Sequence, residues 1–212
     1  MKNRIPKILM SVLLIFLLVL VFLLLWGIKL PSQETMSANV QIVEAPQQET
    51  AMENENFVKE EYVSILPEGE NIARQGKIGC NGFNETYTAQ KSIDGRTTGA
   101  SYWEGESDAY PNELTLTYKE GPVTVHAIRV CVCPDTLWGK RTQTFSVLYT
   151  TDGETRQELI PEASYEFNPD SGNEVILTFD QVELQSIILS FTGNTGAKGA
   201  QVAEWEVYST EQ

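Results

Sequence analysis

The segment Lys91 to Ser107, "KSIDGRTTGASYWEGES", contains the residues of this 212-residue chain that are best suited to binding a metal ion. Asp94 offers a carboxylate, Gly95 allows a sharp turn, and Ser101 offers a hydroxyl. Hard cations such as calcium take six to eight oxygen ligands, which include carboxylates, hydroxyls and backbone carbonyls. The same residues also fit a simple turn in which glycine takes a positive φ. The segment therefore predicts either a calcium loop or a plain turn.

Catalytic residues are not indicated. His126 is the only histidine, and it lies within "VTVHAIRV", where a histidine is typical of an ordinary strand position. The chain contains no GxSxG or HExxH motif and no phosphate-binding glycine loop. We therefore predict that the protein is not an enzyme.

The three cysteines, Cys80, Cys131 and Cys133, leave two alternatives open. Cys131 and Cys133 are two residues apart on a predicted strand, so their side chains share a face but diverge, which disfavours a disulfide between them. Cys80 could pair with one of them. Alternatively, all three are buried thiols that act as small hydrophobic residues.

A long apolar run, Ile8 to Ile28, lies near the N-terminus. About twenty apolar helical residues cross the ~30 Å hydrocarbon core of a bilayer. A cleaved signal peptide has a shorter apolar region and a small-x-small cleavage site, and "GIKLPSQETMSAN" contains no convincing one. We therefore predict a retained signal anchor at residues 8–30.

Positive residues predict the orientation of this anchor. Lys2, Arg4 and Lys7 precede the apolar run, whereas only Lys29 follows it closely. Because Lys and Arg are retained on the cytoplasmic side, residues 1–7 should form a short cytoplasmic tail. The residues after Leu30 should then lie outside the cell.

Residues 31–67 are rich in Gln, Glu and Asn, and Lys59 is their only basic residue. Such a segment cannot bury enough apolar surface to fold alone, and its like charges keep it extended. We predict an acidic disordered stalk, of which the last part, "VKEEYVSILP", could dock on the domain. The formal net charge of the whole chain is −14, which disfavours nucleic acid and anionic surfaces as partners and favours neutral ligands or cations.

Residues 68–212 contain short apolar or alternating runs separated by turn signals. Examples are "ELTLTY", "TFSVLY", "EVILTFD", "SIILSFTG" and "QVAEWEVYS". In "VTVHAIRVCVC", Val123 and Val125 alternate in one phase, but Ile128 and Val130 follow in the other, and such a change of phase indicates a β-bulge. No apolar stripe at helical spacing occurs in this region. The pattern predicts an all-β fold, an antiparallel β-sandwich.

Four stretches in order carry a family resemblance: "NIARQGKIGCNGFNETYTAQKSIDGRTTGASYWEG", "YPNELTLTY", "PDTLWGKRTQTFSVLYTTDG" and "LSFTGNTGAKGAQVAEWEVYS". Together they resemble a discoidin domain, also called the coagulation factor 5/8 C-terminal-type domain. The bacterial branch grouped with family 32 carbohydrate-binding modules is the most similar. The resemblance extends from about Asn71 to Ser209. It implies a galactose-binding-like jelly-roll β-sandwich.

The resemblance also implies a structural calcium ion (Ca²⁺). Its side-chain ligands would be Asp94, Ser101 and Glu204, although the family usually has Thr at the position of Ser101. Backbone carbonyls near Lys91, Arg96 and Ala203 would complete the coordination shell. Trp103 and Trp205 would pack in the core beside this site, and Tyr102 is expected to enter the core with Trp103.

Family members bind sugars on loops at one end of the sandwich, where an aromatic ring stacks on the sugar and polar groups contact its hydroxyls. The residues here that fit these roles are Trp138, Lys140, Arg141 and Asn194, with Asn84 and Tyr87 as weaker candidates. In the alternative interpretation, Trp138 covers the edge of the sandwich and Arg141 braces the loop.

The resemblance leaves two functions open. The first is a membrane-anchored, non-catalytic module that binds an extracellular glycan, which is expected to be a neutral polysaccharide because the chain is acidic. The second is a module that uses the same fold for adhesion or for contact with an envelope protein. An exposed Trp138–Arg141 pair would favour glycan binding, whereas a buried Trp138 and an apolar patch elsewhere would favour protein contact.

Overall fold

The computed structural model describes residues 41–42, 62–133 and 138–210. Residues 1–40, which include the predicted cytoplasmic tail and signal anchor, lie outside the described residues, as does most of the predicted stalk. Within the described part of the chain, no helix is long and apolar enough to cross a membrane.

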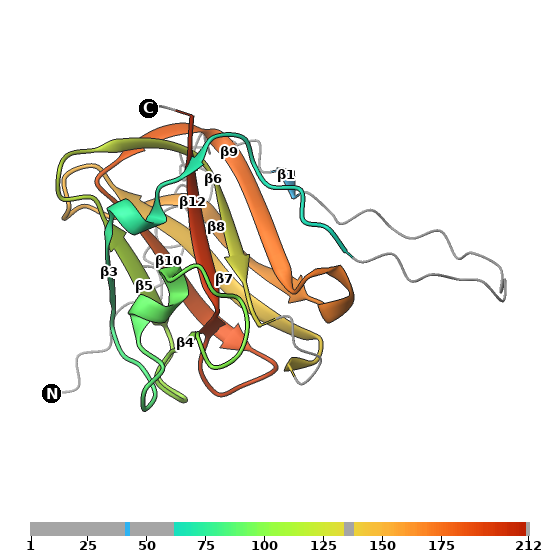
Figure 1. The fold of residues 1–212 in the computed structure, drawn as a ribbon. Helices are drawn as coiled ribbons and strands as arrows, with labels where there is room; N and C mark the ends of the chain where they lie inside the picture. The colour runs from blue at the N-terminus through green and yellow to red at the C-terminus, as the bar shows by residue number, and fades with distance from the viewer. Residues whose placement is uncertain (1–40, 43–61, 134–137, 211–212) are drawn as a thin grey trace, which may run out of the picture. The chain divides into compact units, whose positions relative to one another are not determined.

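Two five-stranded antiparallel sheets form the domain (Figure 1). The first sheet has the order β1 (Gln41–Ile42), β9 (Glu174–Leu184), β6 (Val123–Cys131), β12 (Glu204–Ser209), β2 (Glu70–Asn71). The second sheet has the order β3 (Lys77–Cys80), β5 (Asn112–Thr117), β10 (Ser186–Asn194), β7 (Arg141–Thr150), β8 (Gln157–Phe167). A short ladder pairs β11 (Gln201–Val202) with β4 (Trp103–Glu104). Three 3₁₀ helices are η1 (Ala73–Gln75), η2 (Ala89–Ile93) and η4 (Pro169–Ser171).

The core lies between the two large sheets because their strands alternate apolar and polar side chains. In β5 and the residue that follows it, Leu114, Leu116 and Tyr118 are buried, while the threonines between them are half-buried. In β7, Phe145 and Val147 are fully buried. Successive strand residues point to opposite faces, so this alternation gives each sheet one apolar face. The predicted antiparallel β-sandwich is confirmed.

The predicted β-bulge is also confirmed. The register between β6 and β9 shifts between Val125 and Ala127, which leaves His126 at the irregularity. Beyond the shift, Ile128 and Val130 are fully buried in the core. An unpaired residue changes which face the following side chains take, as the sequence pattern indicated.

The long loops gather at one end of the sandwich, which we call the loop end. It contains residues 81–111, 138–140 and 195–200. Backbone hydrogen bonds join these loops: Gly105 N–H donates to the Ala200 carbonyl (2.9 Å), and Asp108 N–H donates to the Lys198 carbonyl (3.0 Å). The opposite end, the turn end, carries the connections β5–β6, β7–β8 and β9–β10 (Figure 1).

Residues 62–69 form a strap that crosses the outer face of the first sheet (Figure 1). At one end, the Tyr62 hydroxyl donates to Glu174 Oε1 of β9 (2.7 Å), and the Tyr62 ring lies on Gly172. At the other end, Gly69 lies against the Ser209 carbonyl of β12. Because β6 lies between β9 and β12, the strap must pass over all three strands. Part of the segment predicted as stalk therefore packs on the domain.

The three cysteines are free thiols. Cys80 lies in β3 of the second sheet, whereas Cys131 ends β6 of the first sheet and Cys133 follows two residues later. Burial raises the pKa of the Cys131 thiol. Cys131 and Cys133 are buried, as in the alternative in which the cysteines act as small hydrophobic residues, whereas Cys80 is only half-buried.

Candidate functional site

The structure brings together Asp94, Ser101 and Glu204. Asp94 follows η2 and accepts hydrogen bonds from the Ser101 hydroxyl and from Arg96 N–H (2.9 Å). Gly95 N–H donates to Glu204 Oε2 (2.9 Å), which joins the loop to β12. Gly95 has φ of +81°, a conformation that favours glycine. A sharp turn thus places oxygen atoms from distant parts of the chain next to each other.

The electrostatics of this cluster favour a cation. Glu204 is 2% exposed, and burial raises its pKa to about 7. Burial is the largest cause of this value; the carboxylates of Glu206 and Asp94 add to the rise, while Gly95 N–H and Arg74 oppose it. A buried carboxylate beside other carboxylates is stabilised by added positive charge.

The donor set at this cluster is suited to calcium. No group of three or more His, Cys, Asp or Glu side chains in the described residues could hold a metal ion. Asp94 and Glu204 therefore need additional neutral oxygens, such as the Ser101 hydroxyl and backbone carbonyls, and calcium accepts both kinds. The predicted carbonyl donors Lys91, Arg96 and Ala203 lie in the same two segments. These residues fit a calcium ion.

Three half-buried aromatic rings form a row at the loop end, which we call the aromatic row. Tyr87 and Tyr102 stack with ring centroids 4.2 Å apart, and Trp138 meets Tyr102 edge-on at 4.5 Å. A cation lies at each end: Lys91 Nζ is 5.3 Å from the Tyr87 centroid, and Arg141 Cζ is 4.8 Å from the Trp138 centroid. Such cation–π contacts fix the outer rings.

The expectation that Tyr102 enters the core is wrong. Trp103 is fully buried, but Tyr102 is half-buried and belongs to the aromatic row. Successive residues of an extended segment point to opposite sides, so the two neighbours cannot both face the core. Trp205 is fully buried, as expected.

A chain of hydrogen bonds, which we call the polar relay, connects Arg141, Gln201, Glu104, Asn84 and Ser107. Arg141 donates to Gln201 Oε1, and Gln201 Nε2 donates to Glu104 Oε2 (3.0 Å). Asn84 Nδ2 donates to Glu104 Oε1 (2.9 Å) and to Ser107 Oγ (2.8 Å). The relay links β7, β11 and β4 to the loop that contains Asn84. Arg141 belongs to the relay and also contacts Trp138 of the aromatic row, and Tyr102 of the row lies two residues before Glu104 of the relay. It therefore fixes polar groups at the same end as the aromatic row.

The predicted sugar-binding residues divide into two groups. Trp138 and Arg141 contact each other, but Arg141 is 8% exposed and also donates to the Gly139 carbonyl (3.3 Å). Trp138 is half-buried and packs against the core of the sandwich, which is compatible with the alternative in which it covers the edge of the sandwich. Lys140 instead pairs with Glu166 (2.8 Å), and Asn194 bonds Gly196 N–H (2.8 Å) and the Gly199 carbonyl (2.9 Å) within its own loop.

Phe83 is a candidate that the sequence analysis missed. It is 47% exposed, yet the residues on both sides of it are fixed. The Gly82 carbonyl accepts from Trp103 Nε1 (3.1 Å), and Asn84 N–H donates to the Glu104 carbonyl (2.9 Å). The loop thus presents an exposed aromatic ring on a well-ordered backbone. An aromatic residue within the turn-rich stretch "NGFNET" was the available signal.

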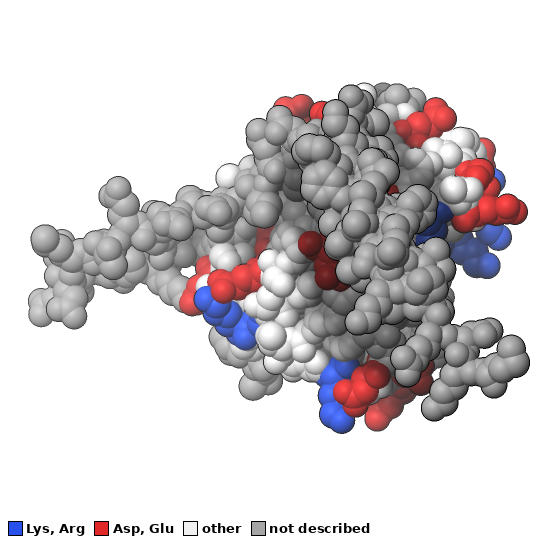
Figure 2. Space-filling model, turned by 180° about the vertical axis from the view of Figure 1, so that it is seen from behind, with Lys and Arg blue, Asp and Glu red and all other residues white. Residues whose placement is uncertain are grey.

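Charge on the face shown in Figure 2 is of mixed sign, with acidic side chains beside basic ones. Exposed ion pairs on the domain include Arg156–Glu113 (2.8 Å) and Lys198–Asp108 (3.1 Å). Exposed pairs of this kind contribute little to stability.

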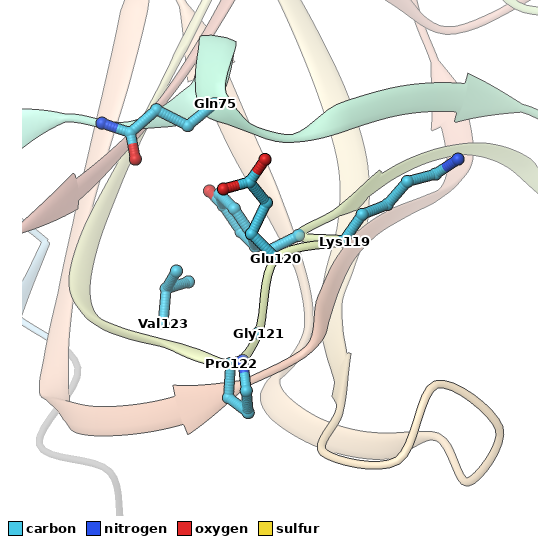
Figure 3. A pocket seen from close by; sticks show the side chains of 7 residues that line it. Gln75, Lys119, Glu120, Gly121, Pro122 and Val123 are labelled. Carbon is cyan, nitrogen blue, oxygen red and sulfur yellow. The ribbon is translucent and has the colours of Figure 1, made fainter.

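A pocket of about 390 Å³ lies at the turn end, away from the aromatic row (Figure 3). It is lined by Gln75, Tyr118, Lys119, Glu120, Gly121, Pro122 and Val123. None of the residues predicted to bind metal or sugar lies in it. We therefore place the candidate site at the loop end, where aromatic and polar groups converge.

Comparison with protein families identifies the domain. The model of the F5/8 type C domain matches residues 77–205. The chain belongs to the F5/8 type C domain family. The match confirms the discoidin resemblance, and it covers both the predicted calcium loop and Glu204. No curated protein matches the chain.

Solved structures of family 32 carbohydrate-binding modules share the fold of this F5/8 type C domain. CpGH89CBM32-5 from Clostridium perfringens, in complex with GalNAc-β-1,3-galactose, is 17% identical with a TM-score of 0.55, and the match covers 66% of this chain and 100% of that one. The C. perfringens NanJ module, in complex with galactose, is 19% identical with a TM-score of 0.53, covering 65% and 96%. The AlyQ module, in complex with 4,5-unsaturated mannuronic acid, is 14% identical with a TM-score of 0.51, covering 66% and 96%. The domain thus has the fold of a carbohydrate-binding module.

Proposed function

We propose that the protein is a membrane-anchored, non-catalytic module that binds an extracellular neutral glycan and contains a structural calcium ion. The observation that carries the proposal is the loop end, where the aromatic row and the exposed Phe83 lie beside the polar relay. Apolar ring faces with a few fixed polar groups are suited to a sugar, which has both apolar faces and hydroxyls.

Charge favours a neutral ligand. The structures with the same fold include complexes with galactose, with GalNAc-β-1,3-galactose and with an unsaturated mannuronic acid. The net charge of this chain is −14, which disfavours binding of acidic polymers. We therefore assign the neutral sugars to this chain.

A calcium ion on Asp94, Ser101 and Glu204 would stabilise the domain without taking part in ligand chemistry. It would join the loop after η2 to β12, two segments that Gly95 and Glu204 already connect through one hydrogen bond. Closing a long loop in this way restricts the unfolded chain more than the folded one.

The predicted anchor at residues 8–30 would hold this domain at the outer surface of the cell membrane, with the N-terminus cytoplasmic. A single shallow site gives weak affinity, but many copies on one membrane bind a polymer together. The protein would thereby retain a glycan near the cell surface.

The proposal is tested by a glycan array probed with the full-length chain, purified in a detergent that has no sugar headgroup. We expect binding to neutral glycans in the presence of calcium, and weaker binding by Trp138→Ala. Absence of binding to every glycan by the unaltered chain would overturn the proposal.

Protein contact is the second candidate function, and the strap favours it. Val63, Ile65 and Leu66 of the strap are 78%, 69% and 51% exposed. An apolar partner surface would cover these side chains. If the array shows no glycan binding, crosslinking from the strap in intact cells would test whether an envelope protein occupies it.

A further inference from the structure

We propose that Glu104 determines the charge specificity of the loop end: its carboxylate accepts hydroxyls of neutral sugars and repels uronic acids. This inference rests on the proposed glycan-binding function. It assigns a specificity role to a residue in the polar relay, beside the aromatic row.

The geometry fixes the Glu104 carboxylate in place. Glu104 ends the short strand β4 and is half-buried. One oxygen accepts from Asn84 Nδ2 (2.9 Å), and the other accepts from Gln201 Nε2 (3.0 Å). An ionised carboxylate offers about four acceptor positions on its two oxygens, so these two bonds leave capacity for ligand hydroxyls. A carboxylate held from both sides is ready to accept them without rearrangement.

No cation is paired with the Glu104 carboxylate in the described residues. Both of its donors are neutral amides. The amide of Gln201 stands between Glu104 and Arg141, because its oxygen accepts from Arg141 while its nitrogen donates to Glu104. The two charges are thus bridged through a neutral group.

Three of the basic groups at or beside the loop end already have partners. Arg141 is buried on the Trp138 face, Lys91 lies over Tyr87, and Lys198 pairs with Asp108. Further acidic side chains on the same loops include Glu85, Glu106 and Asp108. Glu104 lies two residues after Tyr102 of the aromatic row and bonds Gln201, which accepts from Arg141.

The charge of Glu104 should discriminate between sugars that are otherwise alike. A hydroxyl donates to a carboxylate in a charge-assisted hydrogen bond, which is stronger than a bond between neutral groups. A uronate at the same position brings a second negative charge, and the repulsion is large where solvent is partly excluded. We expect galactose oligomers to bind at least tenfold more tightly than galacturonate oligomers of the same length.

The test compares these two oligosaccharides on the full-length chain and on three variants, at low ionic strength where charge effects are not screened. Glu104→Gln removes the charge, and we expect the galactose-to-galacturonate affinity ratio to fall about tenfold. Glu104→Asp keeps the charge and should keep the ratio. Glu106→Gln removes a nearby exposed charge outside the relay and serves as the matched control, with less than a threefold change expected.

Glu104→Gln would place an amide donor toward the amide donor of Asn84 or of Gln201, so thermal melts of each variant accompany the binding data. If Glu104→Gln does not fold, two other measurements test the role of Glu104. They are the galactose-to-galacturonate affinity ratio of Glu104→Asp and the salt dependence of that ratio in the unaltered chain. Preference of the unaltered chain for galacturonate, or a ratio that survives Glu104→Gln, overturns the role of Glu104 while the proposed function stands. Absence of binding to either oligosaccharide overturns this inference, whereas the proposed function is overturned only if the unaltered chain also binds no glycan on the array.

Discussion

At the scale of single residues, the raised pKa of Glu204 makes the proposed metal site dependent on pH. Its folded pKa of about 7 lies above the ordinary value of 4.5, so the folded state disfavours the ionised carboxylate. Without metal, this penalty is fully present above pH 7 and is relieved as the pH falls toward 4.5. A shift of this size corresponds to about 3 kcal/mol.

We therefore expect the chelated protein to have a higher Tm at pH 5 than at pH 8, and calcium to raise the Tm more at pH 8 than at pH 5. Thermal melts with chelator and with calcium at both pH values measure this difference. Glu204→Gln cannot ionise and should lose both responses. A Tm that calcium leaves unchanged at pH 8 contradicts the metal assignment.

Phe83 provides a test that separates binding from stability. Because its ring is 47% exposed, Phe83→Ala removes little packing, and we expect the free energy of unfolding to change by less than about 0.5 kcal/mol. Loss of a stacking ring should nevertheless weaken glycan binding about tenfold or more. Leu66→Ala, at a site 51% exposed on the strap, is the matched control and should bind normally. Equal glycan affinity in the two variants would exclude Phe83 from the site.

At the scale of elements, the strap is joined to the first sheet by a buried charge network. Arg129 pairs with Glu174 (2.5 Å) and with Glu206 (2.9 Å), and Tyr208 donates to Glu206 (2.5 Å). The hydroxyl of Tyr62, in the strap, donates to Glu174 of this network. Burial and the hydrogen bond to Glu174 raise the pKa of Tyr62 to about 12. The strap therefore contributes to the stability of the domain.

Removing the Tyr62 hydroxyl tests this contribution. We expect Tyr62→Phe to lower the free energy of unfolding by about 1–2 kcal/mol, because a hydroxyl–carboxylate bond is lost from a partly buried network. Urea denaturation measures the change. Tyr149→Phe removes an exposed hydroxyl bond to Gln157 (3.0 Å) and should cost less than about 0.5 kcal/mol. Equal stability of both variants would indicate that the strap is not docked in solution.

At the scale of the whole molecule, the predicted anchor and orientation would make the domain accessible from outside the cell membrane. We expect the chain to remain in the membrane fraction after alkaline carbonate extraction, because the apolar residues 8–30 should span the bilayer. Protease added to cells without their outer layers should remove the domain. Deletion of residues 8–30 should release the chain from the membrane fraction, and protection of the domain from protease would contradict the orientation.

Local patterns in the sequence determined much of the fold. Alternation in "ELTLTY" placed Leu114 and Leu116 in the core, and the change of phase around His126 located the bulge, because side-chain direction in a strand depends on residue order alone. The motifs in their order led to the family. The same motifs indicated Asp94, Ser101 and Glu204, which lie together in the structure.

Other features depended on contacts between segments that are distant in the chain, and these only the tertiary structure decided. The sequence gives no means of knowing that Tyr102 joins Tyr87 and Trp138, since those rings lie on three different loops. In the sequence, Arg141 and Lys140 are equally good candidates for sugar binding. In the structure, Arg141 is buried and bonds Gln201, whereas Lys140 is exposed and pairs with Glu166, because neighbouring strand residues point to opposite sides. The sequence around the strap is polar and therefore predicted a stalk. In the structure, the Tyr62 hydroxyl donates to Glu174, which is distant in the sequence. Side-chain partners are set by packing in three dimensions, which spacing along one chain does not record.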